Sequence, residues 1–407
     1  MTLPVGWDEI PLKEVLFFQE GPGVRKWQFT SEGVKLVNVK NIVDGKLNLD
    51  NTDRHLSEEE TYGKYAHFLA DAGDLVMASS GATWGKTAWI GEEHLPLCMN
   101  TSMIRFRPLD DKVVNRNYMR WFLDSTYFSR QIERLITGSA QPNFGPSHLK
   151  QVSMILPPLA EQKRIAAVLD KAAELRTKRQ QAIAHLDTLL QSVFLDMFGD
   201  PLEEWQKVEV LDLVMEGKNK IRTGPFGSQL LHSEFIDDPN GVAVLGIDNA
   251  VQNKFVDTKS RFISQEKYEQ LKRYTVFPGD ILITIMGTCG RCAIVPENIP
   301  LAINTKHLCC ITLDQSKCLP IFLKYAFLLH PDILRQLGVS KKGAIMDGLN
   351  MGAIKKLKLN LPPLTLQGKF EQIERKIFDQ ISKQESLFKN SELLFNSLQQ
   401  RAFRGEL

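Results

Sequence analysis

The sequence predicts an α+β fold that is built twice, as two similar domains joined by a pair of long helices. Three observations predict it. Segments of the first half recur in the second about 205 residues later, each half holds many short apolar and β-branched runs, and each half ends in a long stretch with helical spacing of apolar residues. At 407 residues the chain also exceeds one ordinary core, so two domains are expected.

The repeat covers nearly the whole chain. "GWDEIPLKEV" near Trp7 matches "EWQKVEVLDL" near Trp205, and "LPLCMNT" matches "IPLAINT". "LPPLAEQKRIAAVLDKAA" at 156–173 returns as "LPPLTLQGKFEQIERKIF" at 361–378. A repeat of this size is a whole domain with its helix, because solenoid repeats are only a few tens of residues long.

Within each copy, short runs bounded by Gly, Asp or Pro predict strands. They are "KLVNVKNI", "DLVMAS" and "SMIRFRP" in the first copy, and "AVLGIDN", "DILITIM" and "LCCITL" in the second. Helical stretches follow at 117–136 and 321–337. Strands followed by helices favour α+β over a doubly wound parallel sheet.

A long helix is predicted after each Leu-Pro-Pro-Leu, because the prolines hold the chain extended before it. Apolar residues then recur every three to four positions, from Ile165 to Met197 and from Phe370 to Ala402. A helix of about 40 residues is about 60 Å long, and its apolar stripe needs a partner. We expect the other copy, giving a pair of antiparallel coiled-coil helices about a pseudo-two-fold axis; the alternative is that each helix packs only on its own domain. The expected boundaries are 1–157 for the first domain, 158–199 for its helix, 200–362 for the second domain and 363–407 for its helix.

Composition excludes several classes of protein. With 50 basic and 48 acidic residues the net charge is +2, so any basic surface for nucleic acid must be local. The sequence has no apolar run long enough for a bilayer and no signal-peptide pattern at "MTLPVGWDEIPL", which predicts a cytoplasmic protein without membrane association. Six cysteines, five of them between Cys289 and Cys318, do not form the pattern of a secreted disulfide framework.

A catalytic constellation is not found. Leu-Pro-Pro-Leu is similar to the (Asn/Asp)-Pro-Pro-(Tyr/Phe) motif of amino-methyltransferases, but leucine neither accepts a hydrogen bond nor stacks on a flipped base. Asp332 with Glu374 and Lys376 resembles a nuclease pattern, yet Glu374 and Lys376 are two residues apart on a predicted helix and face different directions. We therefore predict no catalytic residues and no cofactor in this chain.

The cysteines of the second copy could suggest a zinc or redox site. The first copy has Trp84 and Thr87 where the second has Cys289 and Cys292, and our alignment places Arg105 and Phe106 at Cys309 and Cys310. A metal needed for the fold is expected in both copies, so we predict buried free cysteines in strands and no metal.

Loops at matching positions of the two copies are the candidate binding residues. "SSGATWGKT" (79–87) corresponds to "MGTCGRC" (286–292), each copy has an Asn-Thr pair, and "TGSAQPN" (137–143) corresponds to "SKKGAIMDGLN" (340–350). Small residues let a backbone approach a phosphate, cations supply charge and amides can read base edges; the alternative is that these are ordinary turns. The predicted DNA-binding residues are Ser80, Thr83, Trp84, Lys86, Asn100, Thr101, Ser139, Gln141, Asn143, Thr288, Arg291, Asn304, Thr305, Lys306, Lys341 and Lys342.

The order of these motifs resembles the specificity (S) subunit of type I restriction-modification systems over the whole chain. The resemblance rests on "TGSAQPNFGPSHLKQVSMILPPLAEQKRIAAVLD" and the terminal "SLQQRAFRGEL". It implies that each domain is a target recognition domain for one half of a bipartite sequence in double-stranded DNA. It further implies that the helices set the spacing and dock two methyltransferase subunits that use S-adenosylmethionine, and that restriction subunits add ATP-dependent translocation and cleavage. The predicted partner-binding residues are Glu161, Gln162, Arg164, Gln367, Phe403 and Arg404.

The two copies differ where the second has "LTLQGKF" for "LAEQKRI" and "KKGAIMDGLN" for "GSAQPNFG". We therefore expect the two domains to read different sequences, which gives an asymmetric target. Two other readings stay open: an enzyme in its own right, of nuclease or methyltransferase type, and a coiled-coil protein whose domains bind other proteins.

Overall fold

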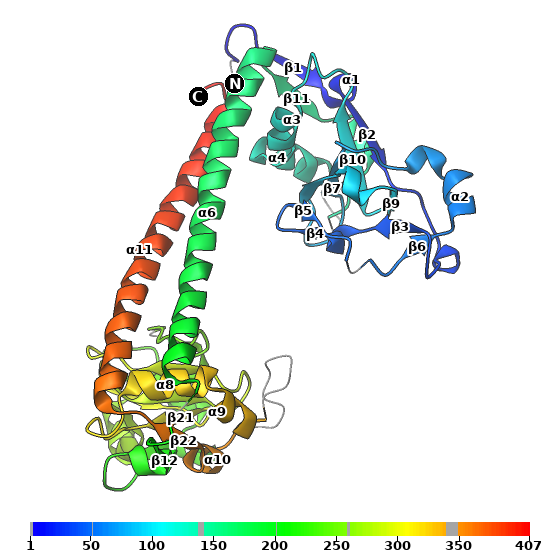
Figure 1. Ribbon diagram of the computed structural model, residues 1–407. Helices are drawn as coiled ribbons and strands as arrows, with labels where there is room; N and C mark the ends of the chain where they lie inside the picture. The colour runs from blue at the N-terminus through cyan, green and yellow to red at the C-terminus, as the bar shows by residue number, and fades with distance from the viewer. Residues whose placement is uncertain (1–2, 51, 137–141, 201, 259–260, 339–348) are drawn as a thin grey trace. The chain divides into compact units, whose positions relative to one another are not determined.

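The computed structural model describes residues 3–50, 52–136, 142–200, 202–258, 261–338 and 349–407. By packing, the chain divides into two compact units, Met1–Gln180 with Ser386–Leu407 (unit 1) and Gln181–Glu385 (unit 2). The division falls within both long helices, so each unit holds part of each helix (Figure 1). We call the remainder of each unit its head, residues 3–158 in unit 1 and 199–363 in unit 2. In the described ranges, no helix has both the length and the apolar character needed to cross a bilayer.

Head 1 contains an antiparallel sheet of order β2-β10-β7-β8 and a smaller sheet of order β6-β3-β9, in which β3 and β9 run parallel. A two-stranded ladder joins β1 to β11, directly before the first long helix, and β4 and β5 form a hairpin. The strands are β1 Asp8–Pro11, β2 Leu16–Glu20, β3 Val34–Val37, β4 Ile42–Val43, β5 Lys46–Leu47, β6 His55–Leu56, β7 Leu75–Ala78, β8 Thr87–Trp89, β9 Leu97–Met99, β10 Met103–Pro108 and β11 Ser153–Leu156.

The helical stretch predicted at 117–136 is two helices, α3 and α4. The side chain of Ser125 accepts a hydrogen bond from the backbone N–H of Phe128, so it caps a new helix and interrupts the stretch. Asn115 caps the first helix in the same way through Tyr118. The short helices of head 1 are α1 Leu12–Val15, α2 Glu58–Tyr62, α3 Arg116–Leu123, α4 Thr126–Leu135 and α5 Pro146–Leu149, with 3-10 turns η1 Lys26–Gln28, η2 Val39–Asn41, η3 Ala66–Phe68 and η4 Glu92–His94.

Head 2 repeats this topology. Its main sheet has the order β13-β21-β18-β19, its second sheet the order β14-β16-β15-β20-β17 with β15 and β20 parallel, and β12 pairs with β22. The strands are β12 Gln206–Glu209, β13 Ile221–Thr223, β14 Phe235–Ile236, β15 Val242–Leu245, β16 Phe262–Ile263, β17 Thr275–Val276, β18 Ile281–Thr284, β19 Cys292–Ile294, β20 Ala302–Asn304, β21 Leu308–Ile311 and β22 Lys358–Leu361. The short helices are α7 Gln265–Leu271, α8 Pro320–Leu329, α9 Pro331–Gln336 and α10 Met351–Lys355, with η5 Val210–Leu213, η6 Gly227–Gln229, η7 His232–Glu234, η8 Ile247–Asn249 and η9 Lys272–Tyr274.

These topologies confirm the predicted mixture of strands and helices and the internal repeat. The ladders also correct one alignment: β7 pairs Val76 with Arg105, and β18 pairs Leu282 with Cys310. Arg105 therefore corresponds to Cys310 and not to Cys309. The error of one residue arises because the Asn-Thr loop is longer by one residue in the second copy.

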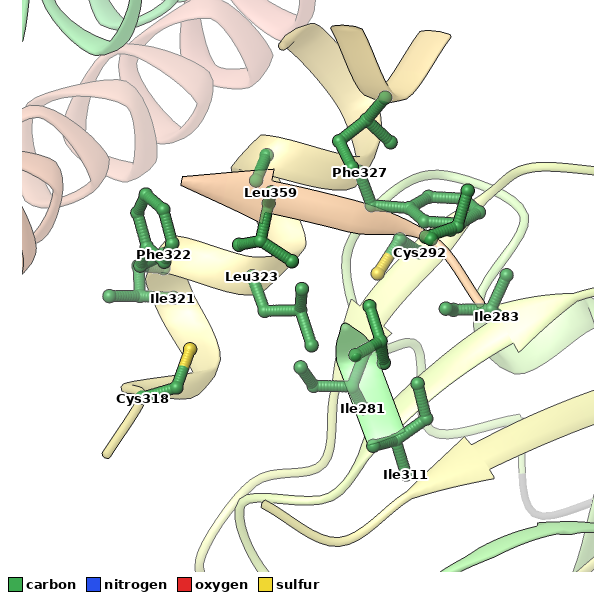
Figure 2. Packing of buried hydrophobic residues seen from close by; sticks show 14 of the residues in the cluster. Ile281, Ile283, Cys292, Ile311, Cys318, Ile321, Phe322, Leu323, Phe327 and Leu359 are labelled. Atoms are coloured by element: carbon green, nitrogen blue, oxygen red, sulfur yellow. The ribbon is translucent and has the colours of Figure 1, made fainter. Parts of the chain in front are cut away.

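The core of head 2 lies between helix α8 and its main sheet. Phe322, Leu323 and Phe327 of α8 are buried together with Ile281, Ile283, Cys292 and Ile311 of the strands and Leu359 of β22 (Figure 2). The predicted burial of the second copy's cysteines in strands is confirmed for Cys292, Cys309 and Cys310, but Cys318 is buried outside the strands and Cys289 is half-buried in the turn between β18 and β19. Burying apolar side chains contributes about 25 cal/mol per Å², so this layer is a main source of the unit's stability.

The predicted long helices are present as α6 Leu159–Phe198 and α11 Leu364–Ala402. The last turn of each is anchored in a head. Phe198 packs on Phe322 at 5.1 Å between ring centroids in unit 2, and Phe403, just after α11, packs on Tyr118 at 5.6 Å in unit 1. In unit 1, Arg176 of α6 stacks on Phe395 of α11 at 4.7 Å. Each head is therefore packed against portions of both long helices.

Candidate nucleic-acid interface

Three predicted loops meet at one edge of the main sheet of head 1. The N–H of Gly81 donates to the carbonyl of Pro142 (3.0 Å), and that of Phe144 donates to Ser79 (3.1 Å). Ser79 in turn donates to the carbonyl of Ser102 (2.8 Å), and Ser80 lies opposite Asn143 in an isolated β-bridge. The segments 79–86, 100–102 and 142–145 therefore form one continuous loop surface.

This surface presents the predicted polar residues to different degrees. Thr83, Lys86, Thr101 and Asn143 are exposed, whereas Ser80 and Asn100 are half-buried. Trp84 is half-buried and packs edge-to-face on Phe144 at 5.8 Å, so it supports the loop from below. The predicted Ser139 and Gln141 lie outside the described residues.

Head 2 joins two of the matching loops by backbone hydrogen bonds of the same kind, while most of its third loop, at 340–350, lies outside the described residues. Ile285 donates its N–H to the carbonyl of His307 (2.9 Å), and Gly290 closes the hairpin by donating to Thr284 (2.8 Å). Thr288 and Arg291 are exposed on that hairpin. Of the remaining predicted residues, Thr305 and Lys306 are half-buried, and Lys341 and Lys342 lie outside the described residues.

Asn304 does not reach this surface. Its side chain is fully buried, and its Nδ2 donates to the carbonyl of Leu308 at 3.0 Å. It ends the inner strand β20 of the second sheet, and its burial and its bond to Leu308 place the side chain inside the head. Asn304 thus fixes the shape of the loop between two strands, and the DNA contact that we predicted for it does not fit this geometry.

A Gly-Pro turn next to each Asn-Thr loop was missed by the sequence analysis. Gly21 and Gly224 follow β2 and β13, and a Cβ atom at either position would collide with the backbone carbonyl of Asn100 or Asn304. Only glycine permits this close approach. The signal was available, because "GPG" and "GPFG" stand at matching positions of the two copies.

Cations lie near the Asn-Thr loop of head 2, although one of them, Arg261, is paired with Asp248. Burial lowers the pKa of His307, and the neighbouring cations Lys306 and Arg261 lower it further. Arg291 is exposed on the adjoining hairpin. The exposed Arg291 and the half-buried Lys306 are therefore the cations that this surface can offer to phosphate groups.

The two glutamines that we predicted to bind a partner subunit instead make hydrogen bonds within the chain, between each long helix and its own head. Gln162 is 1% exposed; its Oε1 accepts from the N–H of Asn115 (2.8 Å) and its Nε2 donates to the carbonyls of Val113 and Pro157 (2.9 and 2.8 Å). Buried amides whose hydrogen bonds are satisfied internally have nothing left for a partner. This corrects the prediction for Gln162.

Gln367 stands at the same point of the second copy and is fully buried. Its Oε1 accepts from the N–H of Leu319 (2.8 Å), and its Nε2 donates to Pro362 (2.8 Å). The reciprocal pattern in both units ties each long helix to its own head, so Gln367 is corrected in the same way.

The remaining predicted partner residues divide into two groups. Phe403 is 2% exposed inside the core of unit 1, so its predicted partner contact is replaced by packing. Glu161, Arg164 and Arg404 are accessible: Arg164 pairs with Glu161 at 2.7 Å and donates to the carbonyl of Leu407, while Arg404 is exposed.

Thiol chemistry does not fit the buried cysteines of the strands. Burial raises the pKa of Cys98 to about 11 and the pKa of Cys292 and Cys309 to about 12, which keeps these thiols protonated at neutral pH. Among the residues that the structure describes, no three His, Cys, Asp or Glu side chains are grouped so as to hold a metal ion.

Comparison with known proteins gives a consistent result. Residues 4–185 and 203–391 each match the type I restriction modification DNA specificity domain. The specificity subunit of the type I restriction enzyme MjaVIII from Methanocaldococcus jannaschii is 26% identical over 47% of this chain and 46% of that one. The StySPI specificity subunit from Salmonella potsdam is 22% identical over 100% of this chain and 90% of that one.

A solved structure concerned with complex assembly and conformational transition of the type I R-M system contains a chain of similar fold. Its TM-score is 0.62 at 18% identity, with 100% of both chains covered. The two domain matches together span most of the sequence, one on each half of the repeat. The chain therefore belongs to the type I restriction-modification specificity subunits and carries two copies of their DNA specificity domain.

Proposed function

We propose that this chain is the non-catalytic subunit that gives a type I restriction-modification complex its DNA sequence specificity, and that each head reads one half of a bipartite, asymmetric target. The observation that carries the proposal is the repeated loop surface. In each head a Gly-Pro turn, a glycine-rich hairpin and an Asn-Thr loop are joined by backbone hydrogen bonds at one edge of the main sheet. The backbone framework is common to both heads, while some exposed side chains differ, as Lys86 does from Arg291.

The framework suits recognition because base reading requires side chains held in fixed positions. Exposed polar and cationic residues on these loops, such as Lys86 and Arg291, can contact phosphates, while hydroxyl and amide groups can contact base edges. Different side chains on the same framework give different half-sites, which is why we propose an asymmetric target.

The long helices are proposed to pair as an antiparallel coiled coil that sets the distance between half-sites. Contacts inside each unit support this, because Phe194 of α6 packs on Phe370 of α11 at 5.3 Å in unit 2 and Phe395 lies beside α6 in unit 1. We further propose that two methyltransferase subunits, which supply S-adenosylmethionine chemistry, dock on the helices, with restriction subunits completing the complex in the cytoplasm. Glu161, Arg164 and Arg404 remain accessible for such docking.

The proposal is tested by expressing the chain with a methyltransferase subunit encoded beside it and mapping methylated adenines across a genome. We expect methylation at one bipartite sequence with a fixed spacer. Exchanging residues 1–155 for those of another specificity subunit should change one half-site only. Inserting four residues near Ala182 in α6, about one helical turn, should lengthen the spacer and leave both half-sites unchanged.

Methylation without sequence preference, or a head exchange that alters both half-sites, would contradict the proposal. Turnover by the isolated chain with a metal or with S-adenosylmethionine would instead favour an enzyme. A complex that forms but never methylates DNA would favour a protein-binding role.

A further inference from the structure

Two exposed apolar side chains flank the Asn304–His307 loop of head 2. Phe226 is 50% exposed and Met286 is 40% exposed. In the sheet order β13-β21-β18, the strand β21 begins at the end of this loop and is antiparallel to both neighbours. Phe226 follows the end of β13 and Met286 follows the end of β18, so they stand on the two sides of the loop.

Backbone contacts hold both residues close to the loop. Gly224, two residues before Phe226, packs against the carbonyl of Asn304. Ile285, directly before Met286, donates its N–H to His307 at 2.9 Å. Exposed apolar side chains that lie together, and not singly, mark interaction sites.

The charge around the pair indicates what it binds. Lys306 lies on the flanked loop beside His307, whose pKa is lowered by burial and by the cations Lys306 and Arg261, and Arg261 is itself paired with Asp248. Arg291 lies on the hairpin that starts at Met286. Apolar side chains among cations suit a partner with an anionic exterior and an apolar interior, which describes stacked base pairs behind two rows of phosphates.

Head 1 lacks this pair. By the register of the matching strands and turns, Gly23 stands at the place of Phe226 and Ser80 at the place of Met286. The exposed Trp27 of head 1 lies further along the chain in η1, which leads to the bridge between Thr30 and His55 beside the smaller sheet. The two heads therefore share the loop framework but differ in its apolar content.

We propose that Phe226 and Met286 form a wedge that enters the base stack of the half-site read by head 2, while head 1 reads its half-site without a wedge. This rests on the proposed DNA-reading function and adds a mechanism to one head. Inserted Phe and Met side chains are known to unstack a base step and kink the duplex, which gives head 2 a preference for deformable steps that base contacts alone would not supply.

The test uses the complex of the full chain with its methyltransferase subunit and duplexes carrying its own target, with 2-aminopurine at successive positions of each half-site. Unstacking raises 2-aminopurine fluorescence. We expect a rise at one step of the head 2 half-site on binding, and its loss in Phe226→Ala and Met286→Ser. The double variant should bind about tenfold more weakly, the scale of one lost base–aromatic contact.

Two control variants separate the wedge from general damage. Phe226→Leu keeps an apolar side chain and should retain most of the fluorescence rise. Trp27→Ala removes an exposed aromatic side chain from head 1 and should leave the fluorescence rise in the head 2 half-site unchanged. A specific complex with no fluorescence rise in the head 2 half-site overturns the wedge, as do equal losses at both half-sites. The variants could also lose affinity without any change in fluorescence, by the same amount as when thymine is replaced with uracil in the DNA. That result would mean that the side chains contact a thymine methyl group in the groove, and it would also overturn the wedge. Failure of the unaltered complex to distinguish target from random DNA would instead refute the proposed function.

Discussion

Arg222 and Asp280 form a buried ion pair in unit 2, with Nη2 2.6 Å from Oδ2 and side chains that are 5% and 0% exposed. In unit 1 the pair is Arg105 and Asp74, 3.0 Å apart and equally buried. The aspartates stand at matching positions of the repeat, but the arginines do not.

The arginine has changed strands between the two copies. Arg105 lies on β10 opposite Gln19 of β2, whereas Arg222 lies on β13, at the position of Gln19, opposite Cys310. Both guanidinium groups nevertheless donate to the aspartate and to an equivalent backbone carbonyl, that of Leu69 or Thr275. The buried aspartate requires a cation beside it, and the arginine that supplies this cation can lie on either of two neighbouring strands.

This relationship predicts that Arg222→Met destabilises unit 2 by about 3–5 kcal/mol, because it leaves Asp280 charged and unpaired in the core. Urea unfolding followed by hydrogen exchange of unit 2 peptides measures the change. The matched control adds Cys310→Arg to Arg222→Gln, which recreates the arrangement of unit 1. We expect the double variant to recover part of the loss; an equal or larger loss would show that the strands are not interchangeable.

Gln162→Ala should destabilise unit 1 by about 1–3 kcal/mol, because it leaves the N–H of Asn115 and two carbonyls without partners. Thermal unfolding of the isolated chain measures the effect. Gln367→Ala is the matched variant and should act on unit 2. Weaker methyltransferase binding with unchanged stability would restore the role that the sequence alone had suggested for these residues.

The sequence predicts the duplicated architecture well because the spacing of apolar residues is periodic and the same pattern occurs in both copies. The long helices, the strands and the burial of the cysteines follow from spacing and from the agreement of the two copies. The site was less predictable. Gln162 and Gln367 are polar residues at a conspicuous motif, but only three-dimensional structure reveals that a backbone N–H of a distant helix start points at each of them.

The predicted binding residues were also in error where the burial of a side chain could not be foreseen from the sequence. Asn304 belongs to a loop motif, yet it is also the last residue of strand β20, and its side chain is buried inside the head, where it donates to the carbonyl of Leu308. Phe226 lies outside the loops predicted to bind DNA, and Met286 begins one of them without being a predicted residue; the exposure of both side chains follows only from the three-dimensional structure.

Asp124 gives unit 1 a pH dependence. Its burial raises the pKa to about 6, although Arg120 and a hydrogen bond from Thr87 oppose the shift. The native state then binds a proton more tightly than the unfolded state, so the free energy of unfolding falls as pH rises from about 4 to 6. Because the side chain keeps 21% exposure, we expect about 2 kcal/mol from this group. Urea titrations from pH 4 to 7 should show a smaller decline in Asp124→Asn; parallel curves would exclude Asp124 as the cause.

Lys86 and Arg291 stand at matching positions of the two hairpins, and both are exposed. If each contacts a phosphate, Lys86→Ala and Arg291→Ala should weaken target binding by the complex. Each should also lower the magnitude of the slope of log affinity against log salt by about 0.9, the effect of one lost phosphate contact. Lys13→Ala, in an exposed position at the other end of β2, serves as the control and should leave the slope unchanged.

Substituting one base at a time in each half-site then separates phosphate contacts from base reading. A lysine or arginine that only neutralises phosphate lowers affinity equally for every sequence, whereas one that reads a base relaxes selection at one position of its own half-site. Relaxed selection in the opposite half-site would contradict independent reading by the two heads.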